Sequence, residues 1–289
     1  MTPETTRFAP SPTGYLHLGH AYAAVRAAQL AKRTGGRFLV RVEDTDLGRC
    51  RPEFEQAIFE DMAWLGLEWE TPVRRQSAHF DDYAAALGRL NDLGCTYPCF
   101  CTRREIETEF RASLGAPQGP DGPLYTGTCR GLGEDERRTR IARGESHAWR
   151  LDIACAVARV GGRLTFDERG GGPGGEHGRI EVRADLFGDF VLARKDTPAS
   201  YHLAVVVDDA IQGITTVTRG NDLFASAHIQ RVLQALLGLP APSYCHHRLI
   251  VDAQGKRLAK RDNATTLRHM RTQGVTIGEI YEMLGFTSR

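Results

Sequence analysis

The sequence predicts an α/β fold with a parallel sheet and a ligand site at one edge of that sheet. A helix-forming run over 21–34 ends at a Gly-Gly pair and leads into the apolar run 38–42, which is typical of a buried strand. A second helix and strand are expected over 201–209 and 214–220. Strand, helix and strand in this order form a right-handed parallel unit, and such units bind ligands beyond the carboxyl ends of their strands.

The composition is that of an ordinary globular enzyme. The chain has 289 residues, of which 41% are apolar and 25% are charged, so it can form one large domain or two modest ones. The net charge is only +1, so any nucleic-acid-binding surface must be a local patch. No early apolar stretch resembles a signal peptide, and no run is long enough to span a membrane. We therefore expect a cytoplasmic protein that makes no membrane contact.

The segment 7–20 is the first candidate site. It is a proline-broken turn that leads into the N-terminus of the first helix, so His17 and His20 fall on neighbouring positions of its first turn. A helix N-terminus offers free amide donors and the positive end of a dipole, where phosphate can bind. Gly19 between the histidines lets a ligand approach the backbone closely. The alternative interpretation is a turn with two ordinary polar caps.

Acidic residues at 43–46 follow the first predicted strand, where they could cap the next helix or face the site. Pro52 begins that helix, and another helix is expected from about 79 to 93. Apolar residues recur at helical spacing in the first of these two helices and give it a core-facing side: Phe54, Ile58, Met62 and Leu65. We assign both helices to structure, with no chemistry.

Three of the seven cysteines, Cys99, Cys101 and Cys129, occur within one stretch of distinct composition. A Cys-x-Cys pair followed by a distant cysteine suits tetrahedral zinc, and from the spacing alone Cys95 could be the fourth ligand. A metal ion would stabilise a small insertion that has little core of its own. Cysteines also pack well in apolar cores, so a purely structural role is the alternative.

The stretch that follows contains charged and glycine-rich segments. A helix over 133–143 carries four arginines, for which we favour a solvated face over direct contact with nucleic acid. A strand is expected over 147–153 and a mobile, glycine-rich loop over 167–178. A further strand is expected over 189–196, returning into the parallel sheet.

Two late segments carry residues suited to anions. Arg219 ends the strand 214–220, and its planar guanidinium is well suited to a bidentate contact with a carboxylate. The basic loop 255–262 precedes two short helices. The apolar positions of these helices are Leu267, Met270, Ile280, Met283 and Leu284.

Together these motifs resemble the class I aminoacyl-tRNA synthetases over nearly the whole chain. His17-Leu18-Gly19-His20 is similar to their HIGH signature, and the preceding segment 7–14 looks like the glutamyl and glutaminyl branch. The resemblance implies a doubly wound, Rossmann-like nucleotide-binding sheet split by a zinc-bearing insertion. The first half of the catalytic domain would be at 1–94, and the zinc-bearing insertion at 95–185. The second half of the catalytic domain would follow at 186–240, and the KMSKS-like loop with short helices at 241–289.

The resemblance also implies a reaction, in which glutamate and ATP give glutamyl-adenylate and pyrophosphate by in-line attack at the α-phosphate. Magnesium would accompany ATP through its phosphates. The catalytic residues would be His17, His20 and Lys260, the last of which falls on the second lysine of a KMSKS-like loop. Contacts to ATP would come from His17, Gly19, His20 and Lys260. Glutamate would be held by Arg7, Ser11, Glu43, Tyr201 and Arg219.

Two positions depart from the pattern of the family. Ala259 stands where the KMSKS loop commonly has serine, which is expected to weaken loop closure or contact with pyrophosphate. Val205 stands where full-length glutamyl synthetases commonly have asparagine. The valine removes a polar contact and argues against ordinary charging of tRNA.

The chain is most similar to the short paralogues of the glutamyl synthetases. These have a Cys-x-Cys…Tyr-x-x-x-Cys zinc site, which implies the ligands Cys99, Cys101, Tyr125 and Cys129 here. They attach glutamate to the cyclopentenediol of queuosine at the wobble position of tRNA(Asp). Only 28 residues follow Arg261, too few for the large anticodon-binding region of the full-length enzymes, so we expect no such domain.

The expected partners are ATP, L-glutamate and the anticodon loop of tRNA(Asp), bound by a monomer. A basic stretch could contact the RNA backbone, through Lys256, Arg257, Lys260, Arg261, Arg268 and Arg271. Three alternatives remain open. The chain could be a truncated synthetase that charges a tRNA 3′ end, a non-catalytic RNA-binding paralogue, or another HIGH-type nucleotidyltransferase that uses a different acid.

Overall fold

The computed structural model describes residues 2–112, 118–120, 122–250 and 265–286. Its first half is a three-stranded parallel sheet in the order β1-β2-β3. Strands and helices alternate along the chain: β1 (Thr5–Phe8), α1 (Leu18–Thr34), β2 (Arg37–Val42), α2 (Pro52–Trp64) and β3 (Glu70–Arg75). This confirms the predicted first helix, the strand after it and the helix that begins at proline.

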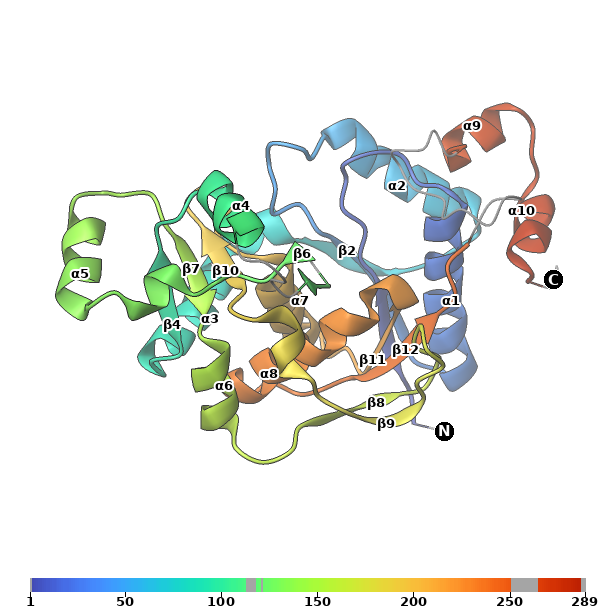
Figure 1. The fold of residues 1–289 in the computed structure, drawn as a ribbon. Helices are drawn as coiled ribbons and strands as arrows, with labels where there is room; N and C mark the ends of the chain where they lie inside the picture. The colour runs from blue at the N-terminus through green and yellow to red at the C-terminus, as the bar shows by residue number, and fades with distance from the viewer. Residues whose placement is uncertain (1, 113–117, 121, 251–264, 287–289) are drawn as a thin grey trace.

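The second half of the sheet is adjacent to the first in space. Its four strands run in the order β11, β12, β8 and β9, at Thr216–Gly220, Ser243–His247, Thr165–Glu168 and Gly178–Glu181. β11, β12 and β8 are parallel, and β9 is antiparallel at the edge. β1 lies beside β11, where the Thr215 N–H donates to the Thr5 carbonyl over 3.0 Å (Figure 1). Such a junction between two halves is where open α/β sheets bind their ligands.

Three helices pack together and cover this junction on one side. They are α3 (Phe80–Asp92), α7 (Tyr201–Ile211) and α8 (Phe224–Leu237), the last preceded by the short helix η4 (Asn221–Leu223). Another short helix, η1 (Gln76–His79), leads into α3. All residues of α7 from His202 to Asp209 are buried, which confirms the buried helix predicted for this segment. The last turn of α7 contains two acids, Asp208 and Asp209, and both lie inside the protein.

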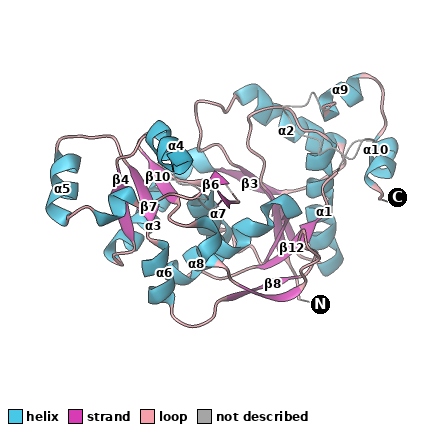
Figure 2. Cartoon of the chain, viewed as in Figure 1, coloured by secondary structure: helices cyan, strands magenta, loops and turns pink. Residues whose placement is uncertain are grey.

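The insertion forms its own antiparallel sheet, in the order β10-β7-β4. These strands are Val191–Arg194, Ala148–Leu151 and Thr96–Cys99. Around them lie α4 (Arg103–Ala112), β5 (Gln118–Gly119), β6 (Gly122–Pro123), η2 (Thr128–Gly131), α5 (Glu134–Ala142), α6 (Ile153–Val160) and η3 (Ala184–Phe187). Figure 2 shows this sheet and α5 on the side of the molecule away from α1 and the C-terminal helices. The predicted helix at 133–143 and strand at 147–153 are confirmed.

Two expectations about strand placement are wrong. The strand at 189–196 does not return into the parallel sheet, because β10 pairs antiparallel with β7, with Val191 opposite Arg150. The sequence of a four-residue strand does not indicate which sheet it joins. Leu192 of β10 is fully buried although the strand lies outside the parallel sheet. In addition, β8 and β9 fall within 95–185, the range expected for the insertion, yet they extend the sheet that contains β12.

The chain ends in two short helices, as predicted: α9 (Leu267–Thr272) and α10 (Ile277–Leu284). Leu267, Ile280 and Leu284 are buried in the same apolar cluster as α1 and α2, whereas Met283, expected among the apolar contacts, is 52% exposed. The Leu267 N–H donates to the Leu16 carbonyl over 2.8 Å, which attaches α9 to the turn before α1. None of the helices in the described ranges is long and apolar enough to cross a membrane.

Candidate active site

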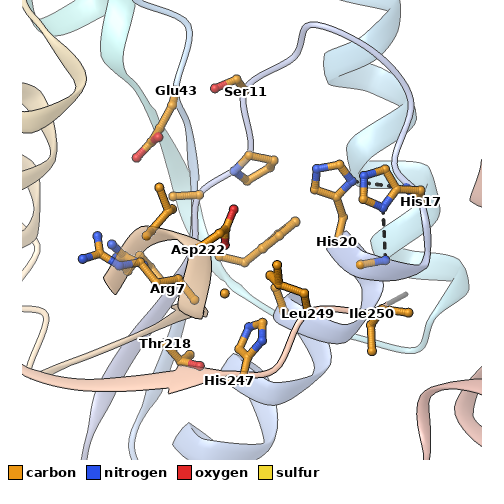
Figure 3. Close-up of a pocket in the computed structure, with 18 of the residues that line it drawn as sticks. Arg7, Ser11, His17, His20, Glu43, Thr218, Asp222, His247, Leu249 and Ile250 are labelled. Carbon is orange, nitrogen blue, oxygen red and sulfur yellow. Dashed lines mark hydrogen bonds between the residues drawn. The ribbon is translucent and has the colours of Figure 1, made fainter. Parts of the chain in front are cut away.

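A cavity of about 490 Å³ lies at the carboxyl ends of β1, β2 and β11, beside the N-terminus of α1. In Figure 3, Arg7 and Glu43 lie on one side of it and the two histidines on the other. Eight of the residues expected in the site line this cavity: Arg7, Ser11, His17, Gly19, His20, Glu43, Tyr201 and Arg219. Lys260 and the rest of the KMSKS-like loop lie outside the described residues.

The histidine motif forms the N-terminal cap of α1. His17 is the N-cap residue, and its Nδ1 accepts from the Gly19 N–H over 3.1 Å. His20 Nδ1 accepts from the His17 N–H over 3.2 Å, and the two rings lie 3.9 Å apart (Figure 3). A neutral imidazole carries one proton, so these bonds leave that proton on Nε2 of each ring. Two N–H donors therefore adjoin the positive end of the helix dipole, which suits phosphate oxygens.

Glycine at position 19 leaves room for the His17 ring. A Cβ at Gly19 would approach His17 Cε1 to 3.0 Å, so a side chain there would displace the ring. The turn before the motif is attached to the end of β2, because the Glu43 N–H donates to the Pro10 carbonyl over 3.1 Å. This hydrogen bond brings Ser11 to the same side of the cavity as Glu43 (Figure 3).

Arg7 is buried and held by Asp209 of α7. Its Nε and Nη2 donate to the two carboxylate oxygens over 3.0 and 3.3 Å. Arg41 of β2 donates to the same carboxylate over 2.7 Å and to Glu43 Oε1 over 3.1 Å. Burial alone would raise the pKa of Asp209, but the Arg7 and Arg41 guanidiniums bring it below its usual value. Burial does raise the pKa of Glu43, against the opposing effect of the same two arginines.

Arg219 is also buried, but its partners are neutral. Its Nε donates to His246 Nε2 over 3.1 Å. Its Nη1 donates to Gln230 Oε1 over 2.9 Å and to the Tyr201 hydroxyl over 3.3 Å. Its Nη2 is buried without a hydrogen-bond partner in the described part of the chain. An arginine held in this way has a charge and an N–H group available for an anion in the cavity.

Four buried residues that support the site were not predicted: Arg41, Asp209, Gln230 and His246. Two of them have a signal in the sequence, because a charged residue inside an apolar run is costly to bury and needs a partner. Arg41 interrupts the apolar strand β2, and Asp209 follows the apolar run of helix α7. Gln230 and His246 carry no such signal. Val205, one turn after Tyr201 on α7, is buried in the apolar core.

The predicted zinc ligands come together beside the antiparallel sheet. The three Sγ atoms lie within 4.8 Å of one another, in Cys99, Cys101 and Cys129. The Tyr125 hydroxyl lies 3.4 Å from Cys101 Sγ and accepts from the Cys129 N–H over 2.8 Å. Three thiols and one phenol in this space fit a tetrahedral zinc ion, which prefers sulfur ligands.

Cys95, the alternative fourth ligand, lies apart from this cluster. Its Sγ is 3.2 Å from Cys155 Sγ, and it belongs to the apolar core around α7 and α8. The cluster of cysteines instead packs with Tyr97 and Tyr125. The structure therefore groups Tyr125, and not Cys95, with the three cysteines.

Comparison with known proteins identifies the family. A model of the catalytic domain of class I tRNA synthetases, of the E and Q kind, matches residues 4–285. The chain belongs to this family. It is therefore an enzyme of the tRNA ligase class, and its Rossmann-like sheets are those of a class I synthetase catalytic domain.

Two relatives match the synthetase over most of its length. The glutamyl-Q tRNA(Asp) synthetase of Rhodobacter capsulatus is 49% identical, over 97% of this chain and 99% of the relative. The protein of the same name from Nocardia farcinica is 42% identical, over 96% of this chain and 82% of the relative. A crystal structure of a glutamate tRNA ligase from Elizabethkingia meningosepticum, in complex with its amino acid, superposes with a TM-score of 0.73. It is 28% identical, over 90% of this chain and 52% of that one.

Proposed function

We propose that this synthetase activates glutamate with ATP and transfers it to the queuosine base in the anticodon of tRNA(Asp). The observation that carries the proposal is the 49% and 42% identity to two proteins named glutamyl-Q tRNA(Asp) synthetase. The cavity supports it, because all five residues expected to hold glutamate line one space together with the histidine motif.

In the proposed first step, an oxygen of the glutamate α-carboxylate bonds to the α-phosphorus of ATP. The bond from that phosphorus to the bridging oxygen breaks, and pyrophosphate leaves. His17 and His20 would donate from Nε2 to phosphate oxygens, and Gly19 would let the backbone approach them. Lys260 would neutralise charge on the leaving pyrophosphate. Magnesium would bind with ATP, mainly through phosphate oxygens and with few protein ligands.

Glutamate would lie between the two buried arginines. Arg219 would contact the side-chain carboxylate through Nη2, beside the Tyr201 hydroxyl. Glu43 would accept hydrogen bonds from the ammonium group, and Arg7 and Ser11 would complete the site. Positioning of the α-carboxylate against the α-phosphate would supply most of the catalysis, as is usual in phosphoryl and nucleotidyl transfer.

In the proposed second step, a hydroxyl of the queuosine cyclopentenediol attacks the carbonyl carbon of the adenylate. The bond from this carbon to the phosphate oxygen breaks, AMP leaves, and the hydroxyl proton passes to solvent. The diol offers vicinal hydroxyls like those of the ribose at a tRNA 3′ end. An anticodon loop presents single-stranded bases that a pocket can enclose, and basic residues such as Arg268 and Arg271 of α9 would contact its phosphates.

One structural zinc ion would bind in the insertion, with Cys99, Cys101, Tyr125 and Cys129 as ligands. It would fasten the end of β4 to the segment around η2, which otherwise packs in only a small apolar cluster. We further propose that the synthetase acts as a monomer in the cytoplasm.

The test of the proposed function is transfer of labelled glutamate to purified tRNA. Transfer is expected to tRNA(Asp) from queuosine-replete cells, and neither to the same tRNA without queuosine nor to tRNA(Glu). Nuclease mapping must locate the label, because periodate cleaves the queuosine diol as well as the 3′ end. Label on the terminal adenosine would instead establish a second candidate, ordinary charging, which the likeness to the glutamate tRNA ligase structure favours. Absence of glutamate-dependent pyrophosphate exchange would indicate a non-catalytic RNA-binding role.

A further inference from the structure

Behind Arg219 lies a buried pair of side chains from two other strands. His246 of β12 shares a hydrogen bond of 2.5 Å between its Nδ1 and Glu168 Oε2 of β8, and both side chains are fully buried. The second carboxylate oxygen, Oε1, accepts from the His246 N–H over 3.0 Å and from the Gly170 N–H over 2.8 Å. The carboxylate is thus fixed on the protein backbone.

This arrangement determines which nitrogen of His246 carries the proton. A carboxylate only accepts, so Nδ1 must donate, and Nε2 is left as the acceptor for the Arg219 Nε–H. Burial lowers the pKa of His246, and the positive charge of Arg219 lowers it further, against the effect of Glu168. The imidazole is therefore neutral.

The hydrogen-bond partners of Arg219 differ in charge from those of Arg7, and this difference matters for selectivity. The charge of Arg7 is balanced by the carboxylate of Asp209, which it contacts through two nitrogens. Around Arg219, the described residues supply only an imidazole, an amide and a phenol. Glu168 orients the imidazole but is separated from the guanidinium by the width of the ring.

We propose that Glu168, His246 and Gln230 are positioning residues that set the preference of this site for glutamate over glutamine. They hold Arg219 through neutral acceptors, so no acid among the described residues forms a hydrogen bond with its guanidinium before a substrate carboxylate binds. A carboxylate in their place would balance that charge inside the protein, and the neutral amide of glutamine would then bind as well as the acid. The inference rests on the proposed function, since it takes glutamate as the amino acid.

The first test replaces the neutral acceptor by its isosteric acid. Gln230→Glu places a carboxylate 2.9 Å from Arg219 Nη1. The ratio of kcat/KM for glutamate to that for glutamine, measured by pyrophosphate exchange, is expected to fall roughly 10- to 100-fold. The matched control is Gln234→Glu, one turn along α8, which is equally buried but donates to the Tyr244 hydroxyl instead. It also places a buried carboxyl group on α8, but one that does not hydrogen-bond to Arg219, and its selectivity is expected to stay at the wild-type value.

The second test reverses the orientation of the histidine. In Glu168→Gln, the amide oxygen can still accept from the two backbone N–H groups, but the amide nitrogen donates to His246 Nδ1. The imidazole proton then moves to Nε2, where it faces the Arg219 Nε–H, and two donors oppose each other. KM for glutamate is expected to rise roughly 10- to 100-fold with little change in kcat, because Arg219 does not touch the reacting phosphate.

The outcomes separate this inference from the proposed function. Unchanged glutamate-to-glutamine selectivity in Gln230→Glu, or an unchanged KM in Glu168→Gln, would overturn the inference while wild-type exchange still supported glutamate activation. Equal loss of selectivity in Gln230→Glu and Gln234→Glu would also overturn it, since the effect would then follow from the buried charge alone. A wild-type protein without glutamate-dependent exchange would refute the proposed function and this inference with it.

Discussion

The two buried arginines of the cavity have different tasks because their charges are balanced differently. Arg7 belongs to a fixed network in which Asp209 also receives a hydrogen bond from Arg41. Arg219 forms no hydrogen bond or ion pair with an acid in the described part of the chain. The first arginine is therefore expected to contribute to stability as well as to binding, and the second mainly to selectivity.

Removing the charge of Asp209 should destabilise the protein strongly. Asp209→Asn leaves Arg7 buried without its carboxylate and removes one of the acids that pair with Arg41, so the free energy of unfolding should fall by about 3–5 kcal/mol in urea denaturation at pH 7. The control is Asp82→Asn, since Asp82 pairs with Arg74 but is 41% exposed, and its loss should be about 1 kcal/mol or less. Equal losses in the two variants would contradict the buried network.

The pH dependence of this contribution has a definite sign. The pKa of Asp209 in the folded protein lies below its usual value. The stability that the carboxylate supplies is therefore present above the pKa of the unfolded chain, about 3.9, and is lost as the pH falls through the folded value. The difference between wild type and Asp209→Asn should shrink in acid below about pH 4.

At the scale of residues, the sequence predicted groups that belong to continuous motifs. His17, Gly19 and His20 form their cap within one turn of helix, so local pattern alone is informative. The side chains that hold the arginines were not predicted, because they come from distant segments of the chain. Arg41 and Asp209, for example, are 168 residues apart. No local pattern predicts that His246 contacts an arginine, since that contact depends on the pairing of β11 with β12.

At the scale of elements, the insertion should depend on its metal. Untagged protein purified without chelators should contain about one zinc ion per chain by metal analysis. The reason is that three thiols and one phenol fit a closed structural zinc site. Cys129→Ser should lose the metal and lower the melting temperature. Cys155→Ser is the matched control, since this cysteine contacts Cys95 outside the cluster. Less than about half an equivalent in the wild type would favour cysteines that serve only as core.

The stability that Asp61 supplies at the interface between α2 and α9 should fall as the pH rises. Asp61 of α2 is fully buried, and neither of its oxygens has a hydrogen-bond partner among the residues that the structure describes. Arg271 of α9 lies 3.6 Å away. Burial raises the pKa of Asp61 to about 6. An acid with a raised folded pKa stabilises the protein fully below its unfolded value, about 3.9, and this contribution is lost as the pH rises through about 6.

Asp61→Asn should therefore be more stable than the wild type at pH 8, by on the order of 2–3 kcal/mol, with a much smaller gain at pH 5. Urea denaturation at the two pH values measures this difference. Glu60→Gln is the control, because Glu60 also contacts Arg271 but is 46% exposed, and no comparable trend is expected. A gain that is equal at both pH values would show that ionisation of Asp61 is not its cause.

At the scale of the whole molecule, the C-terminal helices complete the core of the N-terminal half. Ile280 of α10 is fully buried in the cluster that contains α1 and α2, whereas Met283 of the same helix is 52% exposed. Ile280→Ala should reduce the free energy of unfolding by about 2–5 kcal/mol. Met283→Ala should change it by less than about 0.5 kcal/mol. Similar effects of both substitutions in urea denaturation would mean that α10 does not dock as described.

The global arrangement was predictable only in part. Helices with clear ends were predicted well, since their signals are local: α1, for example, ends at Gly35 with φ of 63°. Strand partners were not, because the choice of partner depends on contacts across the whole fold. Thus β10 joined the insertion, and β3 and β12 went unpredicted because their polar, partly exposed sequences lack an apolar run.

The junction between β1 and β11 has a consequence for how the protein forms during translation. Arg7 contacts Asp209 at a sequence separation of 202 residues, so the cavity cannot form on the ribosome until most of the chain has emerged. At roughly 5–20 residues per second, this delay is on the order of 10–40 s. Contacts of such long range also slow folding. Until α7 and β11 have been synthesised, Arg7 lacks its carboxylate partner and β1 lacks its neighbour β11, so the N-terminal half of the sheet is completed only late in translation.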